Sequence, residues 1–167
     1  MERWTGLPAM EDTVEVVIEI PRGSRNKYEV DESTGVVRLD RVLYSSVHYP
    51  TDYGFIKGTR AGDGDHLDVL VIVEEPSVPG CHMAVRPLGV LKMWDERGED
   101  HKIVAVPVAD PRFDGIGDLS EIHPHWRKEI ENFFEAYKAL EPRKAVRLAG
   151  WAGRDHAWSI IKSCRKR

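Results

Sequence analysis

The fold is decided by the stretch Asp63-Gly64-Asp65-His66-Leu67-Asp68, which runs directly into Val69-Leu70-Val71-Ile72-Val73. The second part is a bounded, β-branched apolar run, which is typical of a strand buried in a sheet. Three carboxylates at the start of a buried strand repel one another unless positive charge lies beside them. A hard divalent cation can supply that charge, because Mg²⁺ prefers carboxylate oxygens and keeps several of its waters. The stretch therefore predicts a metal site at the end of a central strand.

Two other interpretations of the acidic stretch have to be weighed. Acidic clusters in turns are often simply solvated, and spacing alone does not separate that case from a metal site. An EF-hand would place Asp63, Asp65 and Glu74 at the first, third and twelfth loop positions. However, Leu67 then occupies a ligand position, Asp68 replaces the tight-turn glycine, and a strand follows where a helix should begin. The sequence therefore argues against an EF-hand.

Composition predicts an ordinary globular protein with a single domain, residues 1–167. Of its 167 residues, 41% are apolar and 31% are charged, and 24 Lys and Arg against 28 Asp and Glu give a net charge of −4. A slightly acidic chain lacks the basic field that broad nucleic-acid binding requires, so no nucleic-acid partner is expected. Cys81 and Cys164 stand far apart and form no metal motif. Residues 1–5 do not open a signal peptide and no apolar run is long enough for a membrane span, so a cytoplasmic protein without a membrane partner is expected.

Hydrophobic periodicity divides the chain into a strand-rich first half and a helical second half. Alternating or β-branched runs predict strands at 14–20, 27–31, 36–40, 69–73, 82–94 and 102–106, and a short one at 145–148. Residues 49–54 are interpreted as a turn, with a strand beginning at Phe55. Apolar residues three and four apart predict helices over 126–140, with Pro124 in the first turn, and over 157–164. The pattern suggests a small, mostly antiparallel barrel with helices packed outside it.

Further charged residues fall where the predicted elements direct them toward one place. Asp95 and Asp100 flank a predicted turn, and Lys102 follows two residues later. The strands and the first helix add Glu19, Lys27, Glu29, Arg41, Tyr137 and Lys138. Each alone is more often a surface charge. Together they offer carboxylates for cations and Lys, Arg and Tyr for anions, a combination that suits a polyanionic phosphate substrate held through bridging metals.

The chain resembles one family, the soluble inorganic pyrophosphatases of the Mg²⁺-dependent barrel type. The acidic stretch is close to that family's D-x-D-P-x-D signature, with His66 in place of the proline. The other matching segments lie in the same order and spacing, at 18–21, 27–29, 40–41, 49–50, 53–54, 95–96, 98–102 and 133–138. The acidic motif alone is moderately specific, whereas the whole series is very hard to obtain by chance.

The resemblance implies a fold and a set of site residues. The fold is mainly β with flanking helices (α+β), a five-stranded OB-type barrel with about two α-helices packed outside. The implied metal ligands are Asp63, Asp68, Asp95 and Asp100, with Glu19 and Glu29 in the outer shell or at further metals. The implied pyrophosphate-binding residues are Lys27, Arg41, Tyr53, Lys102, Tyr137 and Lys138. The implied proton acceptor is Asp65, with Asp100 as its rival, and the implied assembly is a homohexamer.

The reaction implied by the resemblance is hydrolysis of pyrophosphate to two phosphates. Several metal ions, Mg²⁺ first with Mn²⁺ or Zn²⁺ as substitutes, would shield the anion and activate water. No Ser, Cys or His motif for a covalent intermediate is present, so direct attack of water on phosphorus is expected. The alternative is a non-catalytic OB-type barrel that binds nucleic acid or another polyanion. The acidic cluster would repel a phosphate backbone without metal, which favours the enzyme.

His66 and Phe55 are the two departures from the family pattern, with Phe55 standing where a tyrosine is common. One interpretation is that histidine replaces the motif proline because the side chain faces solvent. The other is that the imidazole offers softer metals a nitrogen ligand. Strand alternation directs Asp65 and Leu67 away from His66, which favours the first interpretation.

Overall fold

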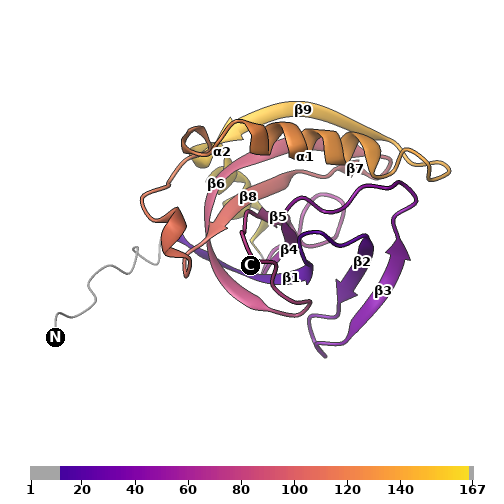
Figure 1. Ribbon diagram of the computed structural model, residues 1–167, viewed down its shortest axis with the longest axis horizontal. Coiled ribbons are helices and arrows are strands. Elements are labelled where there is room, and N and C mark those ends of the chain that lie inside the picture. Colours follow the sequence, from indigo (N-terminus) through magenta and orange to yellow (C-terminus); the bar gives the residue numbers. More distant parts are fainter. Residues whose placement is uncertain (1–11, 166–167) are drawn as a thin grey trace.

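A closed ring of five strands is the centre of the fold in the computed structural model, which describes residues 12–165 (Figure 1). In ring order the strands are β1 (Val14–Ile20), β4 (Asp52–Ile56), β5 (Asp68–Val71), β8 (Lys102–Pro107) and β6 (His82–Asp95). Each strand pairs with the next, and β6 pairs back onto β1. All of these pairs are antiparallel except β5 with β8. The prediction that residues 1–5 do not open a signal peptide concerns residues outside the described part of the chain. Both ends of the predicted domain 1–167 also lie outside it.

The remaining elements extend the ring or cover it. β7 (Gly98–Glu99) and β9 (Val146–Gly153) pair with β6, while β2 (Asn26–Val30) and β3 (Val37–Val42) form a separate two-stranded sheet. The helices are α1 (His125–Ala136) and α2 (Arg154–Cys164), with short 3₁₀ turns η2 (Pro111–Phe113) and η3 (Leu119–Glu121). This arrangement confirms the predicted fold class, a mainly β, five-stranded OB-type barrel with two α-helices outside. Within residues 12–165, no helix is long and apolar enough to span a membrane.

Both faces of the ring strands are apolar, and each belongs to a different core. One cluster takes side chains from all five ring strands and from α2. The other also takes side chains from all five ring strands, together with those of α1. On β5, Val69 and Val71 belong to the cluster with α2 and Leu70 to the cluster with α1. The continuous apolar run behind the acidic stretch is therefore the signature of a strand buried on both faces.

The predicted turn at 49–54 is wrong in its second half, because β4 already begins at Asp52. Gly54, which the sequence suggests as a turn residue, lies inside this strand. A Cβ atom at Gly54 would stand 1.9 Å from the carbonyl oxygen of Val17 on β1. Glycine is therefore needed for close approach of two strands and not for a turn conformation.

The predicted helix over 126–140 ends early, and the predicted strand over 145–148 is too short. α1 ends at Ala136, and Leu140, which the periodicity assigned to the helix, is 67% exposed. The strand β9 continues to Gly153 because it pairs along β6 as far as Gly89. The early end of α1 matters for the site, since it places Tyr137 and Lys138 just beyond the last helical residue.

Candidate active site

A polar pocket of about 500 Å³ opens where the β2–β3 hairpin, the acidic loop before β5, the β6–β8 segment and the end of α1 meet. Every site residue expected from the sequence lines it: Glu19, Lys27, Glu29, Arg41, Tyr53, Asp63, Asp65, Asp68, Asp95, Asp100, Lys102, Tyr137 and Lys138. These residues come from separate elements of the chain. The fold thus brings together all the positions that the resemblance implies.

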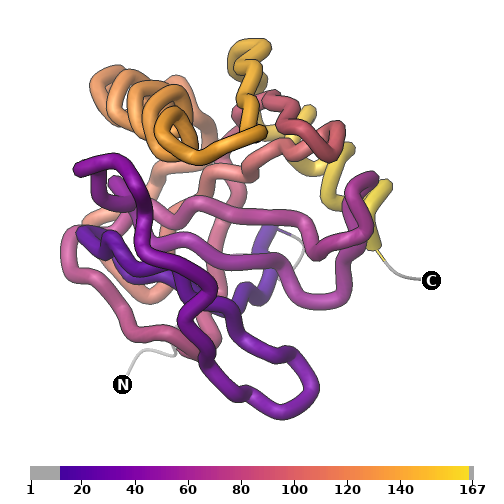
Figure 2. Tube along the Cα trace, turned by 90° about the vertical axis from the view of Figure 1, so that its right-hand side faces the viewer, coloured from indigo at the N-terminus to yellow at the C-terminus, as the bar shows by residue number. Residues whose placement is uncertain are grey.

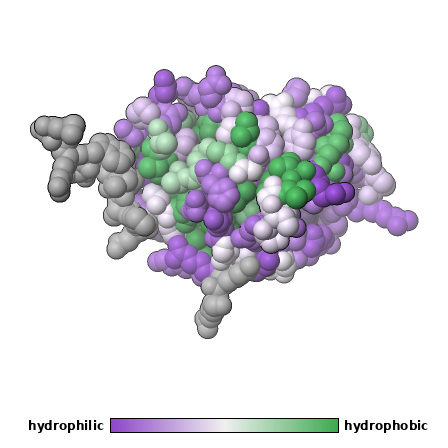
Figure 3. Space-filling model, turned by 90° about the horizontal axis from the view of Figure 1, so that it is seen from below, coloured by the Kyte–Doolittle hydropathy of each residue, from purple (hydrophilic) through white to green (hydrophobic). Residues whose placement is uncertain are grey.

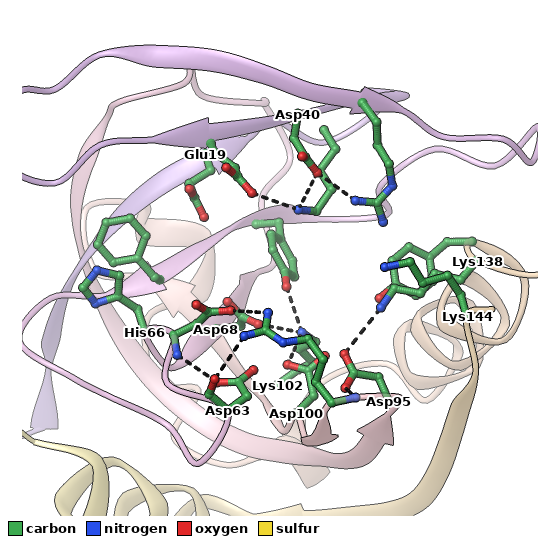
Figure 4. Close-up of a pocket in the computed structure, with 18 of the residues that line it drawn as sticks. Glu19, Asp40, Asp63, His66, Asp68, Asp95, Asp100, Lys102, Lys138 and Lys144 are labelled. Atoms are coloured by element: carbon green, nitrogen blue, oxygen red, sulfur yellow. Dashed lines mark hydrogen bonds and ion pairs between the residues drawn. The ribbon is translucent and has the colours of Figure 1, made fainter. Parts of the chain in front are cut away.

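Lys102 is the central cation of the pocket (Figure 4). Its side chain is 1% exposed, and its Nζ donates to Asp68 Oδ2 at 2.6 Å, Asp100 Oδ1 at 2.9 Å and the Tyr53 hydroxyl at 2.8 Å. Asp68 and Lys102 are direct neighbours because they open the parallel strands β5 and β8. Burial alone would lower the pKa of Lys102, but Asp68, Tyr53 and Asp100 together outweigh it and the pKa lies well above its usual value.

A second group of charges lies at the end of α1. The Lys138 Nζ is 3.4 Å from Asp95 Oδ2 and 3.6 Å from Glu96 Oε1. Lys144 reaches the same Glu96 oxygen at 3.2 Å. Two lysines therefore face the pocket beside one predicted metal ligand, on the side opposite His66 in Figure 4.

The β2–β3 hairpin supplies a third group. Lys27 and Arg41 are cross-strand partners, and both contact Asp40 Oδ2, at 3.2 Å from Lys27 Nζ and 2.7 Å from Arg41 Nη1. Arg41 Nε also lies 2.8 Å from Oε1 of the buried Glu141. Burial raises the pKa of Asp40, but the charges of Lys27 and Arg41 outweigh this effect and leave it lowered. The guanidinium of Arg41 is thereby fixed in orientation beside Lys27.

The acidic loop is held by an arginine that the sequence did not single out. Arg97 Nη1 lies 2.9 Å from Asp65 Oδ2, and Arg97 Nη2 donates to the Asp63 carbonyl oxygen at 3.1 Å. Asp63 in turn accepts from the backbone N–H of Asp65 at 3.0 Å. Asp65 is otherwise open, with its side chain 62% exposed. Arg97 therefore orients the carboxylate that was predicted to accept a proton.

The donor set fits a hard divalent cation. Nine carboxylates line the pocket against seven Lys and Arg side chains, so side-chain cations do not balance the negative charge. Burial, the largest cause, raises the pKa of Glu19 to about 7 and that of Asp100 to about 7. Burial also raises the pKa of Asp63. These buried or half-buried carboxylates lack sufficient positive charge, and their oxygen atoms are the donors that Mg²⁺ prefers.

Most carboxylates of the pocket are paired with side-chain cations. Lys102 lies between Asp68 and Asp100. Lys138 contacts Asp95, and Arg97 contacts Asp65. Among residues 12–165, no three His, Cys, Asp or Glu side chains already form a cluster that could hold a metal ion. A metal ion would therefore compete with these lysine and arginine partners for the carboxylate oxygens.

His66 does not face solvent, so the first interpretation of this position is wrong in its premise. Its side chain is 19% exposed, and its ring stacks on Phe55 with centroids 4.3 Å apart. Nδ1 lies 3.1 Å from the Thr59 carbonyl oxygen and Nε2 lies 2.9 Å from Glu32 Oε2. Both ring nitrogens are thus engaged at the edge of the pocket, apart from the Asp68–Lys102 group (Figure 4).

Several pocket residues were not among the predicted site residues: Asp40, Arg60, Glu96, Arg97 and Lys144. Asp40 and Glu96 adjoin predicted residues and could have been found as their neighbours in sequence. Arg97 and Lys144 lie in exposed segments, where a lone cation is normally read as surface charge. Only their partners in space, Asp65 and Glu96, show that they face the pocket.

Comparison with known proteins gives a consistent result. Residues 16–167 match the family model described as inorganic pyrophosphatase. The inorganic pyrophosphatase of Leifsonia xyli subsp. xyli is 55% identical over 149 residues, covering 89% of this chain and 91% of that protein, and that of Streptomyces coelicolor is 51% identical over 153 residues, covering 92% and 94%. The crystal structure of the Thermus thermophilus inorganic pyrophosphatase superposes with a TM-score of 0.89 at 43% identity, covering 98% of this chain and 97% of that one. The chain therefore belongs to the inorganic pyrophosphatase family.

Proposed function

We propose that this chain hydrolyses inorganic pyrophosphate to two phosphates by direct attack of water on phosphorus, with Mg²⁺ as its metal. The observation that carries the proposal is the pocket itself, which is lined by nine carboxylates and seven Lys and Arg side chains. Carboxylates can hold cations and the lysines and arginines can hold a polyanion, so both are available in one cavity. No observation favours the alternative of a binding-only barrel.

The proposed metal ligands are Asp63, Asp68, Asp95 and Asp100, with Glu19 and Glu29 assisting. Bound divalent cations would neutralise pyrophosphate charge and lower the pKa of water. The all-oxygen donor set favours Mg²⁺, and Mn²⁺ or Zn²⁺ are weaker alternatives because the engaged ring of His66 offers no free nitrogen.

Side chains of the pocket would accept the proton and stabilise the developing charge. Asp65 would accept the proton from the attacking water, and its high exposure leaves one side of the carboxylate open. Asp100 remains the rival, since a carboxyl with a pKa of about 7 is also suited to proton transfer. Attack on one phosphorus breaks its bond to the bridging oxygen, and the electron pair leaves with the second phosphate. The proposed cations that stabilise this developing charge are Lys27, Arg41, Lys102 and Lys138, with Tyr53 and Tyr137 as hydrogen-bond donors.

The test of the proposal is a phosphate-release assay. Pyrophosphate is supplied with Mg²⁺, with Mn²⁺, with Zn²⁺ and with excess chelator, and released phosphate is measured over time. We expect rapid release with Mg²⁺, slower release with the other two metals and none with chelator. Metal-independent release, or no release with any metal, would contradict the proposal.

Arg41→Lys should lower kcat/KM by about tenfold or more, although the charge is kept. The guanidinium is held by Asp40 on one side and Glu141 on the other, which fixes the direction of its remaining donors. A lysine ammonium cannot make both contacts and still present a planar fork to the substrate. Steady-state kinetics would measure the effect, with Arg38→Lys as control, because Arg38 is an exposed residue of the same strand that does not line the pocket. Unchanged kcat/KM would place Arg41 outside the site.

Arg97→Ala should strengthen Mg²⁺ binding by about two- to fivefold. Its guanidinium contacts the Asp65 carboxylate and the Asp63 carbonyl oxygen, so its positive charge lies beside the acidic loop and opposes the binding of a cation by Asp63. Titration calorimetry with Mg²⁺ would measure the change. Arg112→Ala is the matched control, because Arg112 pairs with Glu74 and Asp110 outside the pocket. Weaker Mg²⁺ binding would instead mean that Arg97 holds the loop in ligand geometry.

We also propose that the chain acts as one domain in the cytoplasm and assembles as a homohexamer. The assembly is supported by the resemblance and by apolar residues of the hairpin that reach the surface, namely Val36, Val37, Leu39 and Val42. Hydrophobic areas are also visible among hydrophilic ones on the face seen in Figure 3. Light scattering coupled to size-exclusion chromatography would measure the assembly, and a monomer at micromolar concentration would contradict it.

A further inference from the structure

We propose that His66 is a positioning residue, which latches the tip of the β2–β3 hairpin to the barrel through Glu32 and so holds the hairpin over the pyrophosphate pocket. The proposal rests on the proposed function, because the hairpin carries Lys27 and Arg41, two of the residues expected to bind the substrate. His66 itself would touch neither the substrate nor the metals.

The hairpin needs an anchor because it is not part of the ring. β2 and β3 pair with each other in a sheet of their own, separate from the ring sheet, in the described part of the chain. Figures 1 and 2 show the two strands as an arm that stands out from the ring, with the turn between them at its far end. Each residue from Asp31 to Asp40 is exposed. Within a single chain, few apolar contacts are therefore available to fix the direction of the arm.

Polar contacts fix the hairpin at separate points. On β1, Glu19 Oε2 accepts from the Val30 N–H at 2.9 Å. Arg41, at the opposite end of the hairpin, pairs with Glu141 at 2.8 Å. The turn itself is reached by His66 Nε2, 2.9 Å from Glu32 Oε2. The contact at the turn lies at the far end of the hairpin, where displacement is least restricted by the rest of the chain. Its loss would therefore free the hairpin most.

His66 is held rigidly on the barrel side of this contact. Its ring lies flat on Phe55, which is buried in β4, with an interplanar angle of 15°. Nδ1 faces the Thr59 carbonyl oxygen at 3.1 Å, and Arg60 Nη1 lies 3.2 Å from each ring nitrogen. The ring therefore has one orientation, with Nε2 directed at the hairpin turn. Proline, which the family motif carries here, has no side-chain donor and could not make this contact.

Glu32 is held on the hairpin side by a well-defined turn. Asp31 Oδ1 accepts from the backbone N–H groups of Ser33 and Thr34, at 2.9 and 3.0 Å. Gly35 has a φ of +73°, which suits glycine and closes the turn back onto Asp31. Two preordered groups lose less conformational entropy when they pair than two free surface side chains. The contact can therefore stabilise the position of the hairpin.

The test compares His66→Ala, Glu32→Ala and the double variant with wild type. Each single variant should raise the KM for pyrophosphate about fivefold, because the arm that carries Lys27 and Arg41 is released. The value of kcat should fall by less than KM rises, because the proposed metal ligands and Asp65 stay in place. The double variant should raise KM no further than either single one, since both remove the same contact. Arg38→Gln is the control and should leave KM unchanged, because Arg38 is an exposed residue of the same hairpin that does not line the pocket.

A second readout does not depend on activity. Backbone amides of residues 30–37 should exchange with deuterium several times faster in both single variants than in wild type, with neither metal nor substrate present. Unchanged KM, unchanged exchange, or KM effects that multiply in the double variant would each overturn the latch. Glu32→Ala removes an exposed side chain together with its acceptor oxygens, so it decides the matter even where His66→Ala fails to fold. If wild type released no phosphate, the proposed function would fail while the exchange comparison would still test the latch.

Discussion

Lys102→Met is expected to lower the free energy of unfolding by about 3–5 kcal/mol and kcat/KM by about 10²–10³. Lys102 is buried, and its ammonium contacts both Asp68, at 2.6 Å, and Asp100, at 2.9 Å. Without it, two largely buried carboxylates would face each other with no cation between them. Burial already raises the pKa of Asp100 to about 7, so loss of the lysine would favour the protonated acid still further. A protonated carboxyl is also a poor metal ligand.

Chemical denaturation and phosphate-release kinetics would measure the two effects of Lys102→Met. Lys57→Met is the matched control, because Lys57 forms an exposed ion pair with Glu15, and its loss should cost less than about 1 kcal/mol. Added Mg²⁺ should recover part of the stability that Lys102→Met loses, since a divalent cation binds only the folded arrangement of carboxylates. A Lys102→Met variant as stable and active as wild type would remove Lys102 from the centre of the site.

The strands could be predicted because each local pattern agrees with the final fold. The run from Val69 to Val73 is apolar at every position, and the two apolar clusters on either side of β5 explain why. Periodicity does not say which strands meet. Asp68 and Lys102 are neighbours only because β5 and β8 pair in parallel, a contact between distant parts of the chain. The resemblance supplied that information, whereas composition and spacing did not.

The failures have the same origin in contacts between distant residues. Gly54 was interpreted as a turn residue because glycine usually marks turns, yet here the carbonyl of Val17 leaves no room for a side chain. Arg97 looks like surface charge until the fold brings it to Asp65. His66 was expected to face solvent, because nothing near it in sequence reveals that Phe55 and Glu32 surround its ring.

The second large effect on activity is expected for Asp65→Asn, because Asp65 and Asp68 have different proposed roles within the acidic stretch. This variant should lower kcat by about 10²–10⁴, the usual contribution of a general base, while Mg²⁺ affinity stays close to that of wild type. Asp65 is exposed and held by Arg97 alone among the pocket's cations, so losing its charge disturbs few other groups. Asp68→Asn should instead weaken Mg²⁺ binding along with turnover. Asp68 belongs to the Lys102 group at the start of β5, where its neighbours also include the predicted ligand Asp100.

Titration calorimetry with Mg²⁺ and steady-state kinetics on Asp65→Asn, Asp68→Asn and Asp100→Asn would separate the roles. If Asp65 accepts the proton, Asp65→Asn alone combines a large loss of kcat with normal metal affinity, because amide nitrogen and oxygen cannot take up a proton at neutral pH. If Asp100 accepts it, Asp100→Asn shows that combination instead, and the raised pKa of Asp100 then reflects its catalytic use. Equal losses of Mg²⁺ affinity in Asp65→Asn and Asp68→Asn would contradict the division altogether, since both carboxylates would then act as ligands.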